Sequence, residues 1–139
     1  VSFLNSKDGI ELSGTLTLPK KPVAAVVLVS GSGPQDRNQL FMGHKTFWVL
    51  ADFLSNNNVA VLRFDDRGVG KSQGVFESST SYDFSEDVSA GVDFLKSVPE
   101  LNGNIFGIIG HSEGGLIAPV TANNNANVDF IVLICAACK

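Results

Sequence analysis

The sequence predicts an α/β domain built on a mostly parallel, doubly wound sheet of about six strands, with helices on both faces. The prediction rests on two alternating patterns. Unbroken apolar runs, such as Ala24–Val29 and residues 105–109, are typical of strands buried on both faces of a parallel sheet. Stretches with apolar residues at helical spacing, such as Thr46–Asn56, lie between strands. Strand–helix alternation of this kind favours right-handed crossovers.

The expected elements follow one another along the whole chain, without an internal repeat. Two short strands flank a turn at residues 7–9, which is a hairpin signal. Asp83 and Glu86 resemble a capping box at a helix N-terminus, and Pro99 is expected to end that helix. The expected strands are 1–5, 10–18, 24–29, 59–64, 105–109 and 130–134, and the expected helices are 46–56, 83–98 and 113–122.

Composition limits the classes of protein that this chain can be. With 139 residues, of which 44% are hydrophobic, it is long enough for one globular domain over residues 1–139. A net charge of −4 without a basic cluster argues against nucleic acid as a partner. No apolar run has the length of a membrane span. Because the chain opens at Val1, we expect either that a natural N-terminus has been removed or that the chain was cut from a larger protein, which leaves a cytoplasmic or an exported location open.

The segment most informative about chemistry is Gly110-His111-Ser112-Glu113-Gly114, which follows an apolar strand and opens a helix. This context is typical of a nucleophile elbow. A tight turn lifts one serine hydroxyl above the sheet, and glycines remove side chains that would collide there. The following helix then presents its N-terminal amides to a developing oxyanion. We therefore expect Ser112 to have a positive or otherwise rare backbone conformation.

Three segments, at residues 27–34, 63–72 and 110–115, resemble the signature segments of the α/β-hydrolases. More narrowly, they are similar to the bacterial esterase and serine-aminopeptidase-like branch, and the resemblance covers nearly the whole chain. It implies a serine hydrolase that cleaves an ester, thioester or amide bond in a small-molecule or peptide acyl substrate. It implies neither a cofactor nor a metal.

The resemblance also assigns roles to residues of this sequence. Ser112 matches the nucleophile, and the backbone N–H of Glu113 matches one oxyanion donor. The second donor falls in the glycine-rich loop at residues 30–33, where we assign the N–H of Ser32 and expect Gly31 and Gly33 to line the substrate site. Bare amides in such a loop can approach an oxygen closely. A plain strand-to-loop turn is the alternative.

A complete catalytic triad is not found in the sequence. The superfamily core has about eight strands, and its triad runs in the order Ser, Asp or Glu, then His. Both histidines, His44 and His111, precede Ser112. His111 is expected to pack with its side chain away from the nucleophile, and His44 to line the substrate site or to be solvated at a helix entry.

A serine without its base is a poor nucleophile. We therefore expect the acid and the histidine to follow strands beyond this chain, so that the chain is the N-terminal part of one incomplete domain and is inactive alone. The alternative is a non-catalytic binding module on the same scaffold. The glycines around Ser112 favour the enzyme.

Three other features have simpler interpretations. Residues 68–72 end like a phosphate-binding loop, but Asp65 stands where that motif needs glycine, so we expect a structured turn in which Arg67 connects loops. Residues 31–33 resemble the start of a dinucleotide-binding fingerprint, but Asp36 stands where that motif needs its third glycine. Cys135 and Cys138 have redox spacing but follow a late strand, so ordinary thiols are expected.

The last expected strand, Phe130–Ile134, ends the predicted sheet. No further strand follows it in the sequence to pair with its outer edge. An open apolar edge is a template for pairing with another chain. We therefore expect self-association through this strand, or coverage by the remainder of the same protein.

Overall fold

The computed structural model describes residues 1–136, and within them a six-stranded sheet forms the centre of the domain, in the order β1-β2-β6-β3-β7-β8. Its strands are β1 (Ser2–Asn5), β2 (Ile10–Thr17), β3 (Ala24–Val29), β6 (Val59–Phe64), β7 (Ile105–His111) and β8 (Phe130–Ile134). The ladders joining β6, β3, β7 and β8 are parallel, whereas β1–β2 and β2–β6 are antiparallel. The predicted mostly parallel α/β sheet is therefore confirmed.

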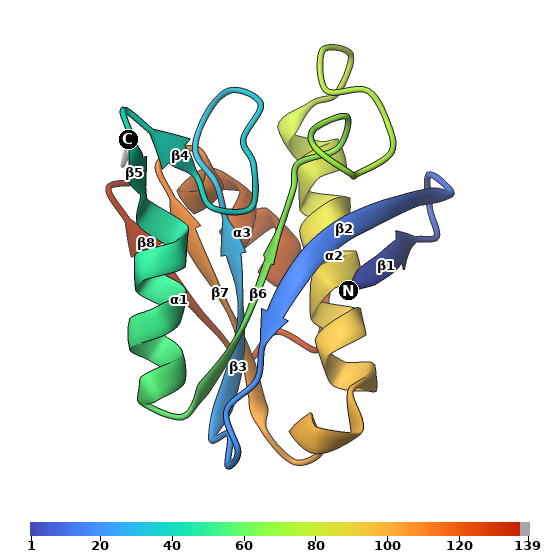
Figure 1. Cartoon of the computed structure of the whole chain (residues 1–139). Coiled ribbons are helices and arrows are strands. Elements are labelled where there is room, and N and C mark those ends of the chain that lie inside the picture. The colour runs from blue at the N-terminus through green and yellow to red at the C-terminus, as the bar shows by residue number, and fades with distance from the viewer. Residues whose placement is uncertain (137–139) are drawn as a thin grey trace.

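Helices cover both faces of this sheet (Figure 1). Helix α1 (Thr46–Asn56) lies on one face, and α2 (Ser81–Ser97) and α3 (Gly114–Asn124) lie on the other. Successive side chains of β3 point to opposite faces, so Val26 packs with the α1 core while Val27 packs with the α2 and α3 core. Burial on both faces explains why the strand is apolar throughout.

The structure corrects the predicted start of α2. Thr80 is the N-cap residue, and its side chain accepts a hydrogen bond from the Asp83 N–H while the Asp83 carboxylate accepts one from the Thr80 N–H. The capping box is thus Thr80 with Asp83, not Asp83 with Glu86. A threonine hydroxyl with an acid three residues later supplies both acceptors, so the helix begins two residues before Asp83. Pro99 does end the helix, and it opens a short 3₁₀ turn, Pro99–Leu101.

The segment between β3 and α1 contains a hairpin that the sequence did not indicate. Strands β4 (Leu40–Phe41) and β5 (His44–Lys45) pair antiparallel around Met42 and Gly43, both of which have positive φ. This hairpin stands at the end of the sheet where β3 and β7 finish (Figure 1). It therefore lies beside the turn that carries Ser112.

Two general properties of residues 1–136 bear on function. Helices within this range lack the combination of length and apolar character that crossing a membrane requires. The same residues contain no cluster of three or more His, Cys, Asp or Glu side chains that could hold a metal ion.

Candidate active site

Ser112 occupies a two-residue turn between the end of β7 at His111 and the start of α3 at Gly114. Its φ is +53°, in the left-handed region that non-glycine residues rarely adopt. Its N–H donates to the Ile134 carbonyl of β8 at 2.9 Å, and its carbonyl accepts from Gly115 N–H at 3.0 Å. The rare backbone conformation predicted for Ser112 is therefore confirmed.

Three glycines make this turn possible because the backbone segments around it are in close contact. A Cβ added to Gly110 would overlap the carbonyl of Gly114, and a Cβ added to Gly114 would overlap the carbonyl oxygens of Val29 and Ser30. At Gly115, an added Cβ would overlap the side chain of Ala136. Strand, turn and helix can approach this closely only without side chains at these positions.

An open hollow of about 460 Å³ lies in front of Ser112. The glycine-rich loop after β3 forms one wall, and a Cβ added to Gly31 would lie 3.2 Å from Ser112 Cβ. The β4–β5 hairpin and the start of α1 form the other wall. The lining residues are Gly31, Ser32, Gln35, Gln39, Phe41, Thr46, His111 and Ser112. The structure thus brings the predicted residues Gly31, Ser32 and Ser112 together at one surface.

His111 and Gln39 form a polar pair in the wall of this hollow. The Nε2 of Gln39 lies 2.6 Å from Nδ1 of His111, in a hydrogen bond whose direction depends on the histidine tautomer. Gln39 is 7% exposed and has a φ of +48°. His111 packs against Gln39, but it lines the same hollow as Ser112, so the expectation that its side chain lies away from the nucleophile is wrong. Gln39 was not predicted, because a lone glutamine in a loop carries no pattern that separates it from an ordinary surface residue.

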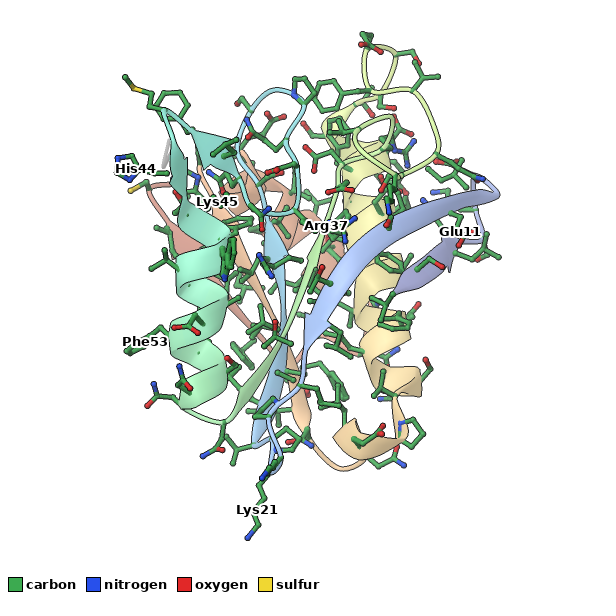
Figure 2. The ribbon with its side chains drawn as sticks, in the orientation of Figure 1. Glu11, Lys21, Arg37, His44, Lys45 and Phe53 are labelled. Carbon is green, nitrogen blue, oxygen red and sulfur yellow. The ribbon has the colours of Figure 1, made fainter. Side chains whose placement is uncertain are left out.

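The other predicted site residues do not line the Ser112 hollow. His44 is exposed on β5 and lines a separate hollow with Trp48, Val49 and Asp52, and Figure 2 shows it at the outer edge of the molecule. The structure does not bring His44 into the Ser112 hollow. Gly33 and Glu113 line a small cavity of about 20 Å³ on the other side of Gly31.

Asp65 anchors the loop that leads from the hollow to the hairpin. Its carboxylate accepts from Nε and Nη2 of Arg37 at 3.0 and 2.7 Å and from the Lys71 N–H at 3.2 Å. Arg37 also reaches the hydroxyls of Ser13 and Thr15 on β2 (Figure 2). Burial works against ionisation, but these hydrogen bonds outweigh it and hold the pKa of Asp65 below its usual range. The turn at residues 68–72 is thus built around a carboxylate.

Arg67 connects loops, as predicted. Its Nε and Nη2 bind the two carboxylate oxygens of Asp87 in α2 at 2.7 and 2.8 Å. Nη2 also reaches Asp8 in the β1–β2 turn at 2.8 Å. Burial raises the pKa of Asp87, and the paired guanidinium only partly offsets this. Without Arg67, Asp87 would be a buried and uncompensated charge.

The cysteine prediction falls partly outside the described residues. Cys135 is exposed, has a φ of +50°, and forms no disulfide within residues 1–136. Cys138 lies outside the described residues.

The fold and the serine turn together define the class of protein. The α/β hydrolase GrgF from Penicillium sp. sh18 matches 98% of this chain and 45% of its own, with a TM-score of 0.84 and 20% identity. The Pyrococcus furiosus esterase Pf2001 matches 92% of this chain and 47% of its own, with a TM-score of 0.73 and 27% identity. The fold is that of an α/β-hydrolase.

Sequence comparison narrows the class to a family. The family model described as serine aminopeptidase, S33, matches residues 20–139, and the chain belongs to this family. Esterase EstD of Thermotoga maritima is 31% identical over 125 residues, which are 88% of this chain and 30% of EstD. The chain therefore spans less than half the length of each of these three relatives. Family membership confirms the resemblance inferred from the sequence and supports a hydrolase function.

Proposed function

We propose that this chain carries the nucleophile and the oxyanion site of a serine hydrolase acting on an ester, thioester or amide bond. The observation that carries the proposal is the conformation of Ser112, with φ of +53° in a turn closed by glycines in front of an open hollow. A strained non-glycine conformation costs on the order of 1–3 kcal/mol and persists only where the surrounding structure imposes it. A serine in an ordinary strand-to-helix turn has no need of it.

In this proposal the Ser112 Oγ attacks the carbonyl carbon of an acyl substrate in the hollow. The carbonyl carbon becomes tetrahedral and its oxygen becomes an oxyanion. When this intermediate collapses, the leaving group departs with the proton taken from Ser112, and water then hydrolyses the acyl-serine ester to a carboxylic acid and free Ser112. We assign the Glu113 N–H and the Ser32 N–H as donors to that oxyanion. Glu113 is the N-cap of α3 and so stands at the positive end of the helix, and the hydrogen bonds that close the turn use the amides of Ser112 and Gly115.

The proton of Ser112 needs a base that residues 1–136 do not offer at the serine. His111 is bound to Gln39, and His44 lines another hollow. We propose that an Asp or Glu and a His further along the full-length protein complete the triad. The relatives support this proposal, because each of them is more than twice as long as the part that this chain matches. The 139 residues alone are then inactive, and the whole protein turns over its substrate.

The test is covalent labelling of the full-length gene product with a fluorophosphonate probe, which reacts with activated serines. Wild-type protein should be labelled at Ser112, and Ser112→Ala should not be labelled. Ser97→Ala is a matched control, since Ser97 is exposed at the C-terminal end of α2, and it should be labelled like wild type. Absence of labelling in a folded wild-type protein would favour a non-catalytic binding module on the same scaffold.

We also propose that the free edge of β8 pairs with another polypeptide segment. Within the described residues β8 is bonded to β7 along one side only, and Val132 and Leu133 are 42% and 44% exposed. Unpaired strand edges with apolar side chains template further pairing. In a preparation of the 139 residues alone, the available partner is a second copy of this strand.

A further inference from the structure

Asp66 connects both ends of the loop that carries the proposed Ser32 donor. At the start of the loop, the Ser30 hydroxyl lies 3.0 and 3.2 Å from the two carboxylate oxygens of Asp66. At its end, the Gln35 N–H donates to the same carboxylate at 2.9 Å, and the Asp66 N–H donates to the Gln35 carbonyl at 3.1 Å. One residue, two positions after the end of β6, thus fixes residues 30–35 at two points.

The segment between these two points lies against Ser112. Residues 30–35 belong to neither strand nor helix, so no ladder holds them in place. Gly31 approaches Ser112 so closely that an added Cβ would be 3.2 Å from the serine Cβ. A shift of this loop would therefore move the Ser32 amide relative to the Ser112 hydroxyl. Misplacement of a catalytic group by about 1 Å can cost on the order of 100-fold in rate.

We propose that Asp66 is a positioning residue whose carboxylate holds residues 30–35 so that the Ser32 N–H faces the oxyanion formed at Ser112. This rests on the proposed function and deepens it, because it names a residue that acts through the oxyanion loop without touching the substrate. No hydrogen bond of the described residues joins Asp66 to Ser112 itself.

The surroundings of Asp66 make the clamp sensitive to pH. Burial beside Phe64, Phe76 and Phe84 is the main cause that raises the pKa of Asp66 to about 7, and the charges of Asp87 and Asp65 raise it further. The hydrogen bonds from Gln35 and Ser30 act in the opposite direction.

The charged groups around this carboxyl are mostly acidic or already paired. Asp87 comes from α2, and Glu113 lines the same cavity from the start of α3. The neighbouring cations are engaged elsewhere, Arg67 with Asp87 and Arg37 with Asp65. No free cation among the described residues therefore compensates the charge of Asp66.

Protonation would weaken the clamp. An ionised Asp66 accepts charge-assisted hydrogen bonds from both Ser30 and Gln35. A protonated carboxyl can still accept from the Gln35 N–H and donate to the Ser30 hydroxyl, but both bonds are then between neutral groups and roughly half as strong. The loop is accordingly held above about pH 7 and loosened below it.

The test uses the full-length gene product and two readouts. The first is kcat and KM for p-nitrophenyl acetate from pH 5.5 to 9. We expect Asp66→Asn to lower kcat on the order of 10-fold to 100-fold at pH 8 with little change in KM. The wild-type rise in kcat near pH 7 should reflect two ionisations, that of Asp66 and that of the proposed triad histidine, and Asp66→Asn should leave only the second. Ser30→Ala should lower kcat less and keep that rise. Asp52→Asn, an exposed carboxylate on α1, is the charge-matched control and should behave like wild type.

The second readout is amide hydrogen exchange of residues 30–35, which does not depend on catalysis. Faster exchange in Asp66→Asn together with the loss of kcat would support the proposal. Unchanged exchange, or faster exchange with a wild-type kcat and pH profile, would overturn it. If Asp66→Asn fails to fold, Ser30→Ala becomes the test. It must then show both faster exchange of residues 30–35 and a lower kcat, or the proposal is wrong. Absence of fluorophosphonate labelling at Ser112 in the wild-type protein would overturn the proposed function and the positioning role with it. Amide hydrogen exchange would still show whether the contacts of Asp66 with Ser30 and Gln35 hold the loop.

Discussion

Replacing Arg67 by methionine should be among the most destabilising single changes in this chain. Methionine keeps much of the side-chain volume but removes both bonds to Asp87, whose side chain is 3% exposed. Asp87 would then retain the Asn5 amide, at 2.7 Å, as its partner. Removing one member of a buried ion pair costs on the order of 3–5 kcal/mol, because the remaining charge stays buried without compensation. We expect a loss of that size in the free energy of unfolding at pH 7.5.

The loss should depend on pH in a defined direction. Burial already raises the pKa of Asp87, and removing the guanidinium raises it further. A carboxyl whose folded pKa lies above its unfolded value loses stability as pH rises through that range. The variant can therefore neutralise Asp87 at low pH, and its deficit relative to wild type should be largest at pH 7.5 and smaller at pH 5.

The assay is equilibrium unfolding in urea, followed by far-ultraviolet circular dichroism at both pH values. Lys7→Met is the matched control, since it breaks the Lys7–Glu86 pair of the same 2.7 Å separation, whose side chains are 52% and 23% exposed. Solvated pairs of this kind contribute about 0–1 kcal/mol. If Arg67→Met lost no more stability than Lys7→Met, the reasoning from burial would be refuted.

Three further outcomes are expected. Gly110→Ala should lose more stability in thermal unfolding than Gly43→Ala. The new Cβ at Gly110 overlaps the Gly114 backbone, so its loss should reach the upper end of the about 1–3 kcal/mol that overpacking costs. Gly43 has a φ of +83° and open space around it, so its variant should lose only about 1–2 kcal/mol from backbone strain, and equal losses would mean that the Ser112 turn can relax. The 139 residues alone should hydrolyse p-nitrophenyl acetate no faster than their Ser112→Ala variant, and a Ser112-dependent burst would show instead that His44 or His111 acts as a base. Light scattering should show that the 139 residues self-associate and that their Val132→Lys variant does so less, because a charge on an edge strand opposes pairing. If both proteins were monomers at high concentration, pairing through β8 would be contradicted.

The sheet was predictable because its central strands are apolar without interruption. The run Ala24–Val29 is buried along its whole length, and such a run admits few other interpretations. The backbone of Ser112 was predictable for a different reason. Glycines on both sides of a serine, between a strand and a helix, leave little choice but a tight turn. Both features were predictable because each depends on a local sequence pattern and not on contacts between distant segments.

The parts of the site that were missed depend on contacts between distant segments. The β4–β5 hairpin turns at Met42 and Gly43, and methionine is not a residue that marks such a turn. The pairing of Gln39 with His111 joins residues 72 positions apart, and neither residue type predicts the other. The sequence pattern placed the capping box of α2 three residues too late, because Asp83 is suited both to the N-cap and to the N3 position and the hydroxyl of Thr80 decides between them.

The order of strands in the sheet has a consequence for how the chain is made. Strand β3 pairs with β6 on one side and with β7 on the other, and both are synthesised later. A nascent chain therefore holds six fully apolar residues without any neighbouring strand until β6 follows about 30 residues later. It lacks the second neighbour, β7, until about 75 residues after β3, a delay of several seconds at ordinary rates of synthesis. During that interval Ala24–Val29 resembles an aggregation-prone segment. Yield in a cell should therefore depend on how soon β7 arrives, and a slow codon run before residue 105 should send more of the product into inclusion bodies.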